Sequence, residues 1–395
     1  MPFDLDKLCG DDLFGIQCLP YGIFQPSDGS APRIGARLGD HVLDLFGMFG
    51  DAYLSASALN PLMEQGRGTW NELRGRIIES LERPRLRDLV VRNARPLNDV
   101  HLGMPFEVAD YVDFFASEHH AVNVARLFRP GTPPLHANWK SLPVGYHGRA
   151  GTVYPSGVPV KRPWGQSASG DGQAIYGPSR KLDFELEVGF VVGRGSPIGQ
   201  PVTVDDFDDY VFGASLVCDW TARDLQAWET FPLGPFTGKS FLTSISHWVV
   251  PLAALDGARL PLPPQDPVPA SYLGGEVPAW GLDLALEVAI NGHAIARPNF
   301  RDMYWSPAQM LAHMTVNGAR TRVGDLFASG TVSGPREDEL GCLMEISKNG
   351  THPVTLGNGN TRSFLEDGDE TVLTGHALLP NGLRVGLGEV RSTVA

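Results

Sequence analysis

One stretch of the sequence, KLDFELEVGFVV at residues 181–192, constrains the fold more than any other. Apolar and acidic residues alternate along it, and a period of two predicts a β-strand. Its apolar face carries Phe184, Leu186, Val188 and Phe190. Its other face carries Asp183, Glu185 and Glu187. Side chains two residues apart on a strand lie roughly 7 Å from each other, so these acids repel one another unless water or a cation screens them.

Two interpretations of the acidic face are open. Antiparallel sheets often have one solvated side, and a wet outer face is the common explanation for acids along a strand. The apolar continuation at residues 189–192 instead favours a strand in the middle of a sheet. Other carboxylates occur in unusual local sequences elsewhere in the chain, which favours a shared cation site.

The composition predicts a large, mostly β fold of the α+β class. The chain has 395 residues, 42% of them hydrophobic, which allows a sizeable core and about two or three domains. The 46 glycines and 32 prolines indicate many loops and turns rather than a helical bundle. No apolar run approaches the roughly 18 residues of a membrane span, and the first residues do not match a secretory signal.

Net charge and cysteine spacing narrow the classes of function. With 45 acidic and 32 basic residues the net charge is −13, which disfavours a surface for nucleic acid or an anionic membrane and is compatible with holding cations. Cys9, Cys18, Cys218 and Cys342 are scattered without a CxxC pair. They predict free thiols in a reducing compartment instead of a disulfide framework or a zinc site. We therefore expect a cytoplasmic protein.

Two units are expected along the chain. Residues 21–45 show short alternating runs with turns and residues 57–89 show helical spacing, so residues 1–105 predict a small β-barrel-like domain with helices. We expect residues 106–395 to form a second, larger unit. Within it, the Pro-rich residues 251–280 predict a surface arm, and residues 283–292 predict a strand that runs into a hairpin turn.

The first chemical motif is DYVDFFASEHHAVNVARLFR at residues 110–129. Ser117 suits the N-cap of a helix over residues 118–128, which puts His120 in the first turn. A histidine at a helix start is usually a polar surface residue, and Arg129 could equally be a surface charge. Residues 142–157, dense in Gly, Pro, Tyr and His, indicate an irregular loop of the kind that often lines a site.

A second motif, DWTARDLQAWETFPLGPFTGKSF, begins at Asp219 after an apolar strand. Thr221 can cap a short helix on which Arg223 and Gln226 share a face. The following Pro/Gly-rich loop leads to two further polar residues, Lys239 and Thr243. Surface ion pairing is the ordinary role of such cations.

The acids suggest a hard cation. Glu345 lies in the apolar run GCLMEIS at residues 341–347, which predicts a strand, and an acid there must be paired or is costly to bury. The other prominent carboxylates are Asp113, Glu185, Glu187 and Asp219. Oxygen donors without cysteine neighbours or HExxH spacing favour Ca²⁺, Mg²⁺ or Mn²⁺ over zinc or copper. Four carboxylates cannot all stay ionised at close range, so a divalent ion is expected if they converge.

Seven segments resemble the fumarylacetoacetate hydrolase family, and with two N-terminal segments the resemblance covers nearly the whole chain. They are DYVDFFASEHHAVNVARLFR, NWKSLPVGYHGR, KLDFELEVGFVVG, DWTARDLQAWE, PLGPFTGKSF, NGARTRVGDLFASGTVSG and FLEDGDETVLTGH. The N-terminal PYGIF and PRIGARLGDHVLDL are similar to the small SH3-like barrel of that family. The resemblance implies this barrel, then a large mixed β-sandwich roll, and a homodimer.

The resemblance also implies an activity and its residues. The activity is metal-dependent hydrolysis of a carbon–carbon bond in a β-diketone: 4-fumarylacetoacetate and water give fumarate and acetoacetate, in tyrosine and phenylalanine breakdown. The implied ligands of Ca²⁺ or Mg²⁺ are Asp113, Glu185, Glu187 and Asp219, with Lys239 and Thr243 near a second, Mg²⁺-type site. The implied catalytic residues are His120 as general base, Glu345 as its partner, and Arg223, Gln226 and Lys239 as donors to developing negative charge. The implied substrate contacts are Arg129, Tyr146, Gln226 and Thr331.

The sequence departs from the family at Phe115 and Thr230, where the family has tyrosines that contact substrate. Losing two hydroxyls alters what a pocket can hydrogen-bond, so a related acylpyruvate or other diketo acid is an alternative substrate. The wider superfamily adds hydration or decarboxylation of 2-oxo acids as alternative reactions. A non-catalytic Ca²⁺-binding structural protein is the remaining alternative.

Overall fold

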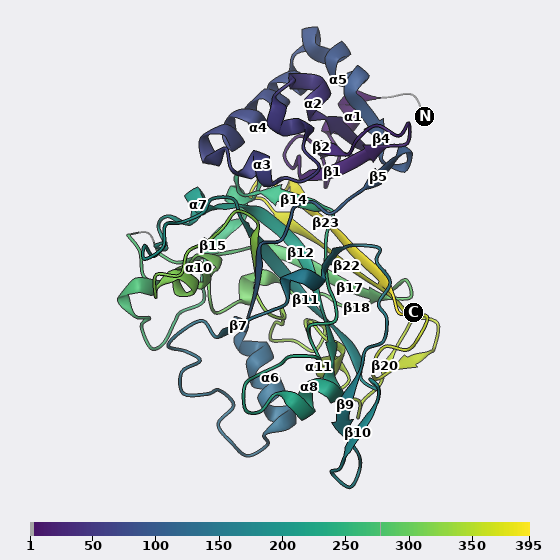
Figure 1. Cartoon of the computed structure of the whole chain (residues 1–395), viewed down its shortest axis with the longest axis vertical. Coiled ribbons are helices and arrows are strands. Elements are labelled where there is room, and N and C mark those ends of the chain that lie inside the picture. Colours follow the sequence, from purple (N-terminus) through teal and green to yellow (C-terminus); the bar gives the residue numbers. More distant parts are fainter. Residues whose placement is uncertain (1–3, 277) are drawn as a thin grey trace.

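The computed structural model describes residues 4–276 and 278–395 and combines helices with several β-sheets (Figure 1). The helices are α1 (Leu5–Cys9), α2 (Leu45–Phe49), α3 (Asn60–Met63), α4 (Gly66–Glu82), α5 (Arg87–Asn93), α6 (Glu118–Phe128), α7 (Phe207–Tyr210), α8 (Arg223–Glu229), α9 (Leu252–Leu255), α10 (Pro307–Thr315) and α11 (Leu343–Ile346). The strands up to β12 are β1 (Tyr21–Pro26), β2 (Arg33–Leu38), β3 (His41–Asp44), β4 (Ala94–Pro96), β5 (Val100–Leu102), β6 (Asp110–Phe114), β7 (Gly145–His147), β8 (Val153–Pro155), β9 (Trp164–Ala168), β10 (Ala174–Pro178), β11 (Leu182–Val192) and β12 (Val211–Ala222). The later strands are β13 (Thr243–Ile245), β14 (Trp248–Pro251), β15 (Arg259–Pro261), β16 (Trp280–Leu282), β17 (Leu284–Ile290), β18 (His293–Ala296), β19 (Asp325–Ala328), β20 (Val354–Thr355), β21 (Thr361–Arg362), β22 (Glu370–Leu378) and β23 (Arg384–Thr393). This mixture confirms the predicted α+β class.

The central strand of the largest sheet is β11, the alternating acidic segment. The sheet has thirteen strands, and its main path runs β4-β3-β2-β1-β14-β12-β11-β19-β6-β7. Strand β11 lies between β12 and β19, and every residue of β11 and β12 is buried. The acidic face of β11 is therefore not a solvated outer face, and its predicted central position is confirmed.

A second sheet, β18-β17-β22-β23, shares its core with the first. One buried cluster contains Leu286 and Val288 of β17 together with Leu186 and Val188 of β11. Burying such side chains stabilises the fold by about 25 cal/mol for each Å² of apolar surface removed from water. The predicted hairpin is also present, because β17 turns into β18 at residues 291–292, both of which have positive φ as a tight two-residue turn requires.

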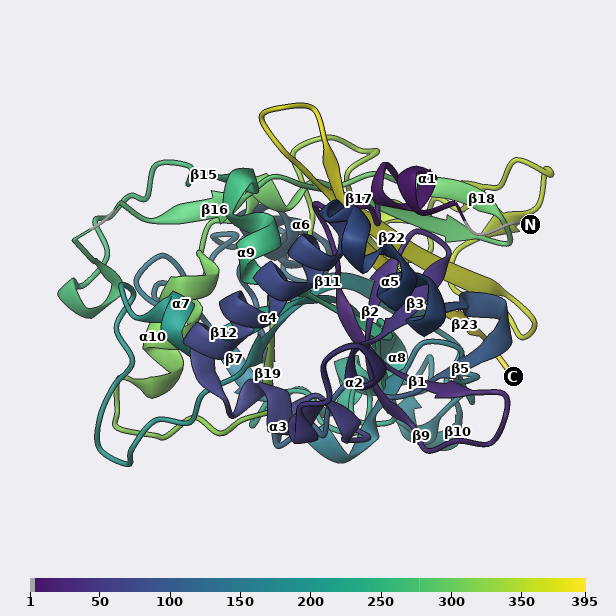
Figure 2. The same ribbon diagram turned by 90° about the horizontal axis from the view of Figure 1, so that it is seen from above.

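Helices α1–α5 gather at one end of the molecule, around strands β1–β5 (Figures 1 and 2). Strand β1 pairs with β14, so the N-terminal strands continue the large sheet. Trp70 of α4 packs edge-on against Phe212 of β12, with ring centroids 5.3 Å apart. Because sheet and core run through both parts, the domain division at residue 105 and the SH3-like barrel stay predictions. The first three residues of that unit lie outside the described residues.

Two local predictions are wrong. Residues 341–347 are not a strand, since α11 occupies most of them. An apolar run this short does not separate strand from helix by periodicity, and the carboxylate of Asp183 decides the outcome by accepting hydrogen bonds from the first backbone N–H groups of α11. Thr221 does not cap α8, because it lies in β12 and its hydroxyl donates to the backbone oxygen of Asp219.

The Pro-rich residues 251–280, predicted as a surface arm, contain regular secondary structure. They include α9, β15 and two short 3₁₀ turns, and β15 pairs with β16 at the far end of the segment. Val277, inside this segment, lies outside the described residues. Across residues 4–276 and 278–395, no helix combines the length and the apolar character that crossing a membrane demands.

Candidate active site

Four carboxylates from three strands meet in the interior of the large sheet. Asp113 lies on β6, Glu185 and Glu187 on β11, and Asp219 on β12. Glu185 is the direct cross-strand neighbour of Asp219, and β19 brings Asp113 close because it pairs with both β11 and β6. One oxygen from each carboxylate lies within 4.8 Å of the others, and all four residues are buried. The structure thus brings the predicted ligand set together.

Two oxygens of this carboxylate cluster have no hydrogen-bond partner among the residues that the structure describes. They are Asp113 Oδ1 and Glu187 Oε1, and both are buried. Burial, together with the neighbouring carboxylates, raises the pKa of Asp113 and of Glu187 well above the ordinary range. A divalent cation would satisfy both oxygens and remove the repulsion, and an all-oxygen donor set suits Ca²⁺ or Mg²⁺. The residues present therefore fit the expected hard cation.

Two buried cations balance the other side of the cluster. Lys239 Nζ donates to Glu185 Oε2 at 2.6 Å and to Asp219 Oδ2 at 2.5 Å. Arg223 Nη1 lies 2.6 Å from Glu185 Oε1. Although burial alone would raise it, Lys239 and Arg223 hold the pKa of Glu185 far below its usual value. Removing one partner of such a buried pair typically costs about 3–5 kcal/mol, because the other charge is left uncompensated.

Tyr146 and Thr331 border the carboxylate cluster. Tyr146 lies opposite Asp113 in the β6–β7 pair, and its hydroxyl bonds to that carboxylate. The backbone N–H of Gly330 donates to Glu187 Oε2 at 3.1 Å. Oγ1 of the next residue, Thr331, is buried and has no partner in the described part of the chain. Only glycine fits at position 330, since φ is +75° and a Cβ would lie 2.2 Å from the carbonyl oxygen of Phe114. The hydroxyl of Thr331 is available to a ligand.

A histidine–glutamate pair adjoins the cluster. The predicted helix is α6, and its N-cap Ser117 accepts from the backbone N–H of His120 at 3.1 Å. His120 Nδ1 lies 2.7 Å from Oε2 of Glu345, which α11 carries. Cys342, just before α11, forms an isolated β-bridge with Glu185 and so ties α11 to the cluster.

The environment of Glu345 decides the tautomer of the histidine. Burial opposes its charge, but His120 and hydrogen bonds from Asn123 and Ser333 lower the pKa of Glu345 below the ordinary value. An ionised carboxylate can only accept hydrogen bonds, so His120 Nδ1 carries the proton. Nε2 is then left with its lone pair, which is the arrangement of a general base.

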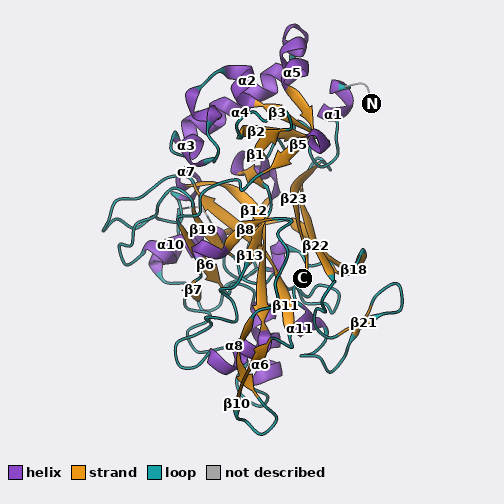
Figure 3. Ribbon diagram, turned by 45° about the vertical axis from the view of Figure 1, so that its right-hand side comes forward, coloured by secondary structure: helices purple, strands orange, loops and turns teal. Residues whose placement is uncertain are grey.

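Sequence reasoning missed the residue that joins the two halves of the site, Asp183. Its Oδ2 accepts from Arg223 Nε at 2.8 Å and from the backbone N–H of Met344 at 3.0 Å, and its Oδ1 accepts from Leu343 N at 2.8 Å. One carboxylate therefore orients both Arg223 and the helix that carries Glu345. Figure 3 shows α6, α8 and α11 grouped around this end of β11. In the sequence, the signal for Asp183 was its place on the acidic face of the strand.

Two family models match the chain. The model described as "Fumarylacetoacetase N-terminal" covers residues 17–105, and "Fumarylacetoacetate (FAA) hydrolase C-terminal" covers residues 111–395. The chain belongs to the fumarylacetoacetate hydrolase family. The second match contains every residue of the carboxylate cluster and of the histidine–glutamate pair.

Similar members of the family carry the name fumarylacetoacetase. The protein from Bos taurus is 43% identical over 406 residues, which cover 97% of this chain and 96% of its own. The protein from Oryza sativa subsp. japonica is 43% identical, with 95% and 93% covered. The solved fumarylacetoacetate hydrolase of Exiguobacterium antarcticum has a TM-score of 0.57 at 18% identity, covering 95% of this chain and 99% of that chain. That structure shares the fold.

Other predicted residues of this family member lie around the cluster. Gln226 Oε1 accepts from Arg223 Nη1 at 3.4 Å, and Thr243 Oγ1 donates to Asp219 Oδ1 at 3.4 Å. Lys239 is beside the predicted ligands, but an ammonium group has no lone pair to offer a cation. Its place near a second cation stays a prediction.

Arg129 is not brought to the cluster by any hydrogen bond of the described residues. It follows the last residue of α6, and its guanidinium donates to the backbone oxygen of Pro134 at 3.4 Å. Nine residues of helix separate it from His120, about 13 Å along the axis. A contact between Arg129 and a substrate carboxylate stays a prediction.

The two departures from the family pattern alter different surroundings. The ring of Phe115 packs edge-on against the imidazole of His120, with centroids 5.3 Å apart. The hydroxyl of Thr230 donates to the backbone oxygen of Gln226 at 2.6 Å and is thus already used at the end of α8. Of the two positions, Phe115 is therefore the one whose side chain contacts the imidazole of His120.

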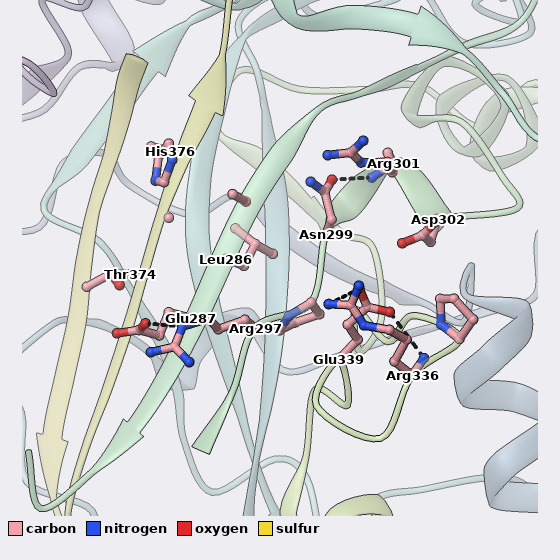
Figure 4. Close-up of a pocket in the computed structure, with 14 residues that line it drawn as sticks. Leu286, Glu287, Arg297, Asn299, Arg301, Asp302, Arg336, Glu339, Thr374 and His376 are labelled. Carbon is pink, nitrogen blue, oxygen red and sulfur yellow. Dashed lines mark hydrogen bonds and ion pairs between the residues drawn. The ribbon is translucent and has the colours of Figure 1, made fainter. Parts of the chain in front are cut away.

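A cavity of about 140 Å³ opens onto the cluster, with Tyr146, Asp219, Lys239 and Thr243 in its wall. A larger cavity of about 600 Å³ lies against β17 and β22 and shares no lining residue with the first (Figure 4). Its arginines are paired with neighbouring acids, Arg297 with Glu287 at 2.8 Å and Arg336 with Glu339 at 3.0 Å. The larger cavity is therefore not the candidate active site, because Asp219 and Lys239 of the carboxylate cluster line the smaller one.

Proposed function

We propose that the protein hydrolyses a carbon–carbon bond of a β-diketone, with 4-fumarylacetoacetate as substrate and fumarate and acetoacetate as products, in tyrosine and phenylalanine breakdown. The observation that carries the proposal is the convergence of four buried carboxylates beside the His120–Glu345 pair. The 43% identity to proteins named fumarylacetoacetase, over nearly the whole chain, supports the choice of substrate.

His120 starts the reaction as general base. Nε2 takes a proton from water, and the oxygen adds to one carbonyl carbon of the diketone. Glu345 steadies the imidazolium through its hydrogen bond to Nδ1, the role of the third member in a triad. Collapse of the adduct then breaks the carbon–carbon bond, its electron pair leaves on the methylene carbon as an enolate, and the proton held by His120 is returned to that fragment.

Charge on the reacting oxygens meets preorganised donors. Arg223 Nη2 is buried and has no hydrogen-bond partner within residues 4–276 and 278–395, so it can donate to an oxyanion. Gln226 contacts Arg223, and Lys239 shares the carboxylate of Glu185 with Arg223. Losing one such donor typically costs about 100- to 1,000-fold in rate. A cation held by Asp113, Glu185, Glu187 and Asp219 would supply Lewis-acid polarisation of the dicarbonyl oxygens. Thr331 would hold a substrate oxygen through its unpartnered hydroxyl.

We propose Ca²⁺ or Mg²⁺ as the cation, with Mn²⁺ as another hard ion that the same oxygens suit. A cytoplasmic homodimer without nucleic-acid or membrane partners is the proposed physiological form. The net charge of −13 supports the lack of such anionic partners.

Two variants test the proposal, each assayed for bound metal and for hydrolysis of fumarylacetoacetate with saturating Mg²⁺ or Ca²⁺. His120→Ala should keep the metal and lose about 100- to 10,000-fold in kcat. Glu187→Ala should lose both metal and rate, because it removes a ligand with an unpartnered oxygen. Full activity of His120→Ala would refute the assigned base, and a protein without any activity would support the structural Ca²⁺-binding alternative.

Phe115 favours one second candidate, hydrolysis of a related acylpyruvate, because it places an apolar ring beside His120 where the family has a tyrosine. Parallel assays with fumarylacetoacetate and with an acylpyruvate separate the two substrates. Product analysis that distinguishes cleavage from hydration or release of CO₂ separates both from the other reactions of the superfamily.

A further inference from the structure

A second group of possible metal ligands lies next to the carboxylate cluster and has a different chemical character. His120, Cys342 and Glu345 each offer one ligand atom, a nitrogen, a sulfur and an oxygen, and these atoms lie within 4.8 Å of one another. Cys342 Sγ donates to Glu345 Oε2 at 3.2 Å, and the same oxygen lies 2.7 Å from His120 Nδ1. All three residues are buried.

This donor set does not suit the hard cation of the carboxylate cluster. Thiolate and imidazole ligands select zinc-like ions, with bonds of about 2.3 Å to sulfur and about 2.0 Å to nitrogen. The two groups share no residue, so both can be considered at once. Ca²⁺ or Mg²⁺ would prefer the four carboxylates, and a thiophilic ion would prefer the mixed group.

We propose that His120, Cys342 and Glu345 form an inhibitory site for a thiophilic divalent cation of the Zn²⁺ or Cd²⁺ class. Binding forms bonds from the cation to the thiolate, to His120 Nδ1 and to the carboxylate; the thiol proton leaves to solvent, and the imidazole proton shifts from Nδ1 to Nε2 by exchange with solvent. The cation then separates Glu345 from His120 Nδ1. Catalysis stops because the base has lost the partner that fixes its tautomer.

The other cysteines do not offer this combination. In the parts of the chain that the structure describes, Cys342 is the only cysteine that belongs to such a group of ligands. Cys18 is buried and donates to the backbone oxygen of Gly386 at 3.4 Å, and Cys9 is half-buried near the N-terminus. Inhibition should therefore depend on one thiol. Because the three ligands are buried, the ion enters only through local opening, and inhibition should develop with time.

The experiment titrates the full-length protein with CdCl₂ in the presence of saturating Mg²⁺. A Cys9→Ser background removes the half-buried thiol, and two further variants, Cys342→Ser and Cys18→Ser, are compared in it. Serine at 342 keeps a hydroxyl donor for Glu345, in the place of the Sγ donor of Cys342. For each protein we measure the ultraviolet thiolate-to-cadmium charge-transfer band. We also measure its activity, relative to the rate of the same protein without Cd²⁺.

The parent and Cys18→Ser should show the band with about one equivalent of Cd²⁺ and lose activity in step with it. Cys342→Ser should lack the band and need at least about 100-fold more Cd²⁺ for the same fractional inhibition, since losing even an outer hydrogen-bond partner of a metal ligand commonly costs 10- to 100-fold in affinity. Equal sensitivity of Cys342→Ser and Cys18→Ser, or no band in the parent, would overturn the proposal. The band does not depend on substrate, so the site is tested even if the proposed diketone hydrolysis fails.

Discussion

Replacing Glu345 by glutamine separates the charge of this residue from its geometry. Glu345 Oε2 receives three donors, His120 Nδ1 at 2.7 Å, Ser333 Oγ at 2.8 Å and Cys342 Sγ at 3.2 Å. Among the described residues, the one donor to Glu345 Oε1 is Asn123 Nδ2, at 2.9 Å. In Glu345→Gln the amide oxygen should therefore take the Oε2 position. The new NH₂ group faces Asn123, whose own amide can turn over to accept it.

The expected loss follows from this arrangement. Because the glutamine oxygen still accepts from Nδ1, the tautomer of His120 is kept and only the charge-assisted part of the hydrogen bond disappears. Hydrogen bonds to charged groups contribute about 1.5–3 kcal/mol, which corresponds to a fall of about 10- to 150-fold in kcat. A carboxamide that imposes the wrong tautomer in a triad costs about 10,000-fold. The size of the fall in kcat thus distinguishes loss of the charge on residue 345 from a change of the His120 tautomer.

The assay measures kcat for fumarylacetoacetate with saturating metal, together with the metal content of the variant. Glu337→Gln is the matched control, because that side chain is 93% exposed and should change nothing. A loss of kcat near 10,000-fold would show that the amide of Asn123 does not flip and that His120 does not keep its proton on Nδ1. An unchanged rate would refute the role of Glu345 in steadying the imidazolium.

Two other perturbations test the site and its support. Asp183→Asn should destabilise the fold by about 3–5 kcal/mol in chemical denaturation, since it breaks a fully buried pair with Arg223. The control is Asp367→Asn, which breaks the ion pair with Arg162; the Asp367 side chain is 71% exposed, so this change should cost under about 1 kcal/mol. Equal losses of stability in the two variants would contradict the supporting role of Asp183. Metal-free protein should lose stability as the pH rises above about 4, the ordinary pKa of carboxyl groups, because burial and the neighbouring carboxylates raise the pKa values of Asp113 and Glu187 in the fold. The stabilising neutral forms of both groups are lost as the pH rises through those raised values. Saturating Mg²⁺ should flatten this dependence in thermal melts, and a metal-free protein that instead gained stability with pH would refute the raised values.

Local chemistry in the sequence determined several elements of this protein. Strict alternation predicted the strand that became β11, because side chains on a strand alternate between faces whatever the partner strands are. Ser117 predicted the start of α6 to the residue, since an N-cap depends only on atoms within one turn. The abundance of oxygen donors predicted a hard cation before any position was known. The long sequence motifs indicated the family, and this resemblance implied the roles of the site residues.

Only the tertiary structure decided which of these groups meet. Asp113 reaches Glu185 because β19 lies between β6 and β11, an order set by long-range pairing. The helix at residues 343–346 forms where the carboxylate of Asp183, far away in sequence, accepts from its N-terminus. The contact of Cys342 with Glu345 follows from that helix. The physical reason is range: periodicity and capping depend on neighbours a few residues apart, whereas register and strand order depend on how distant segments pack.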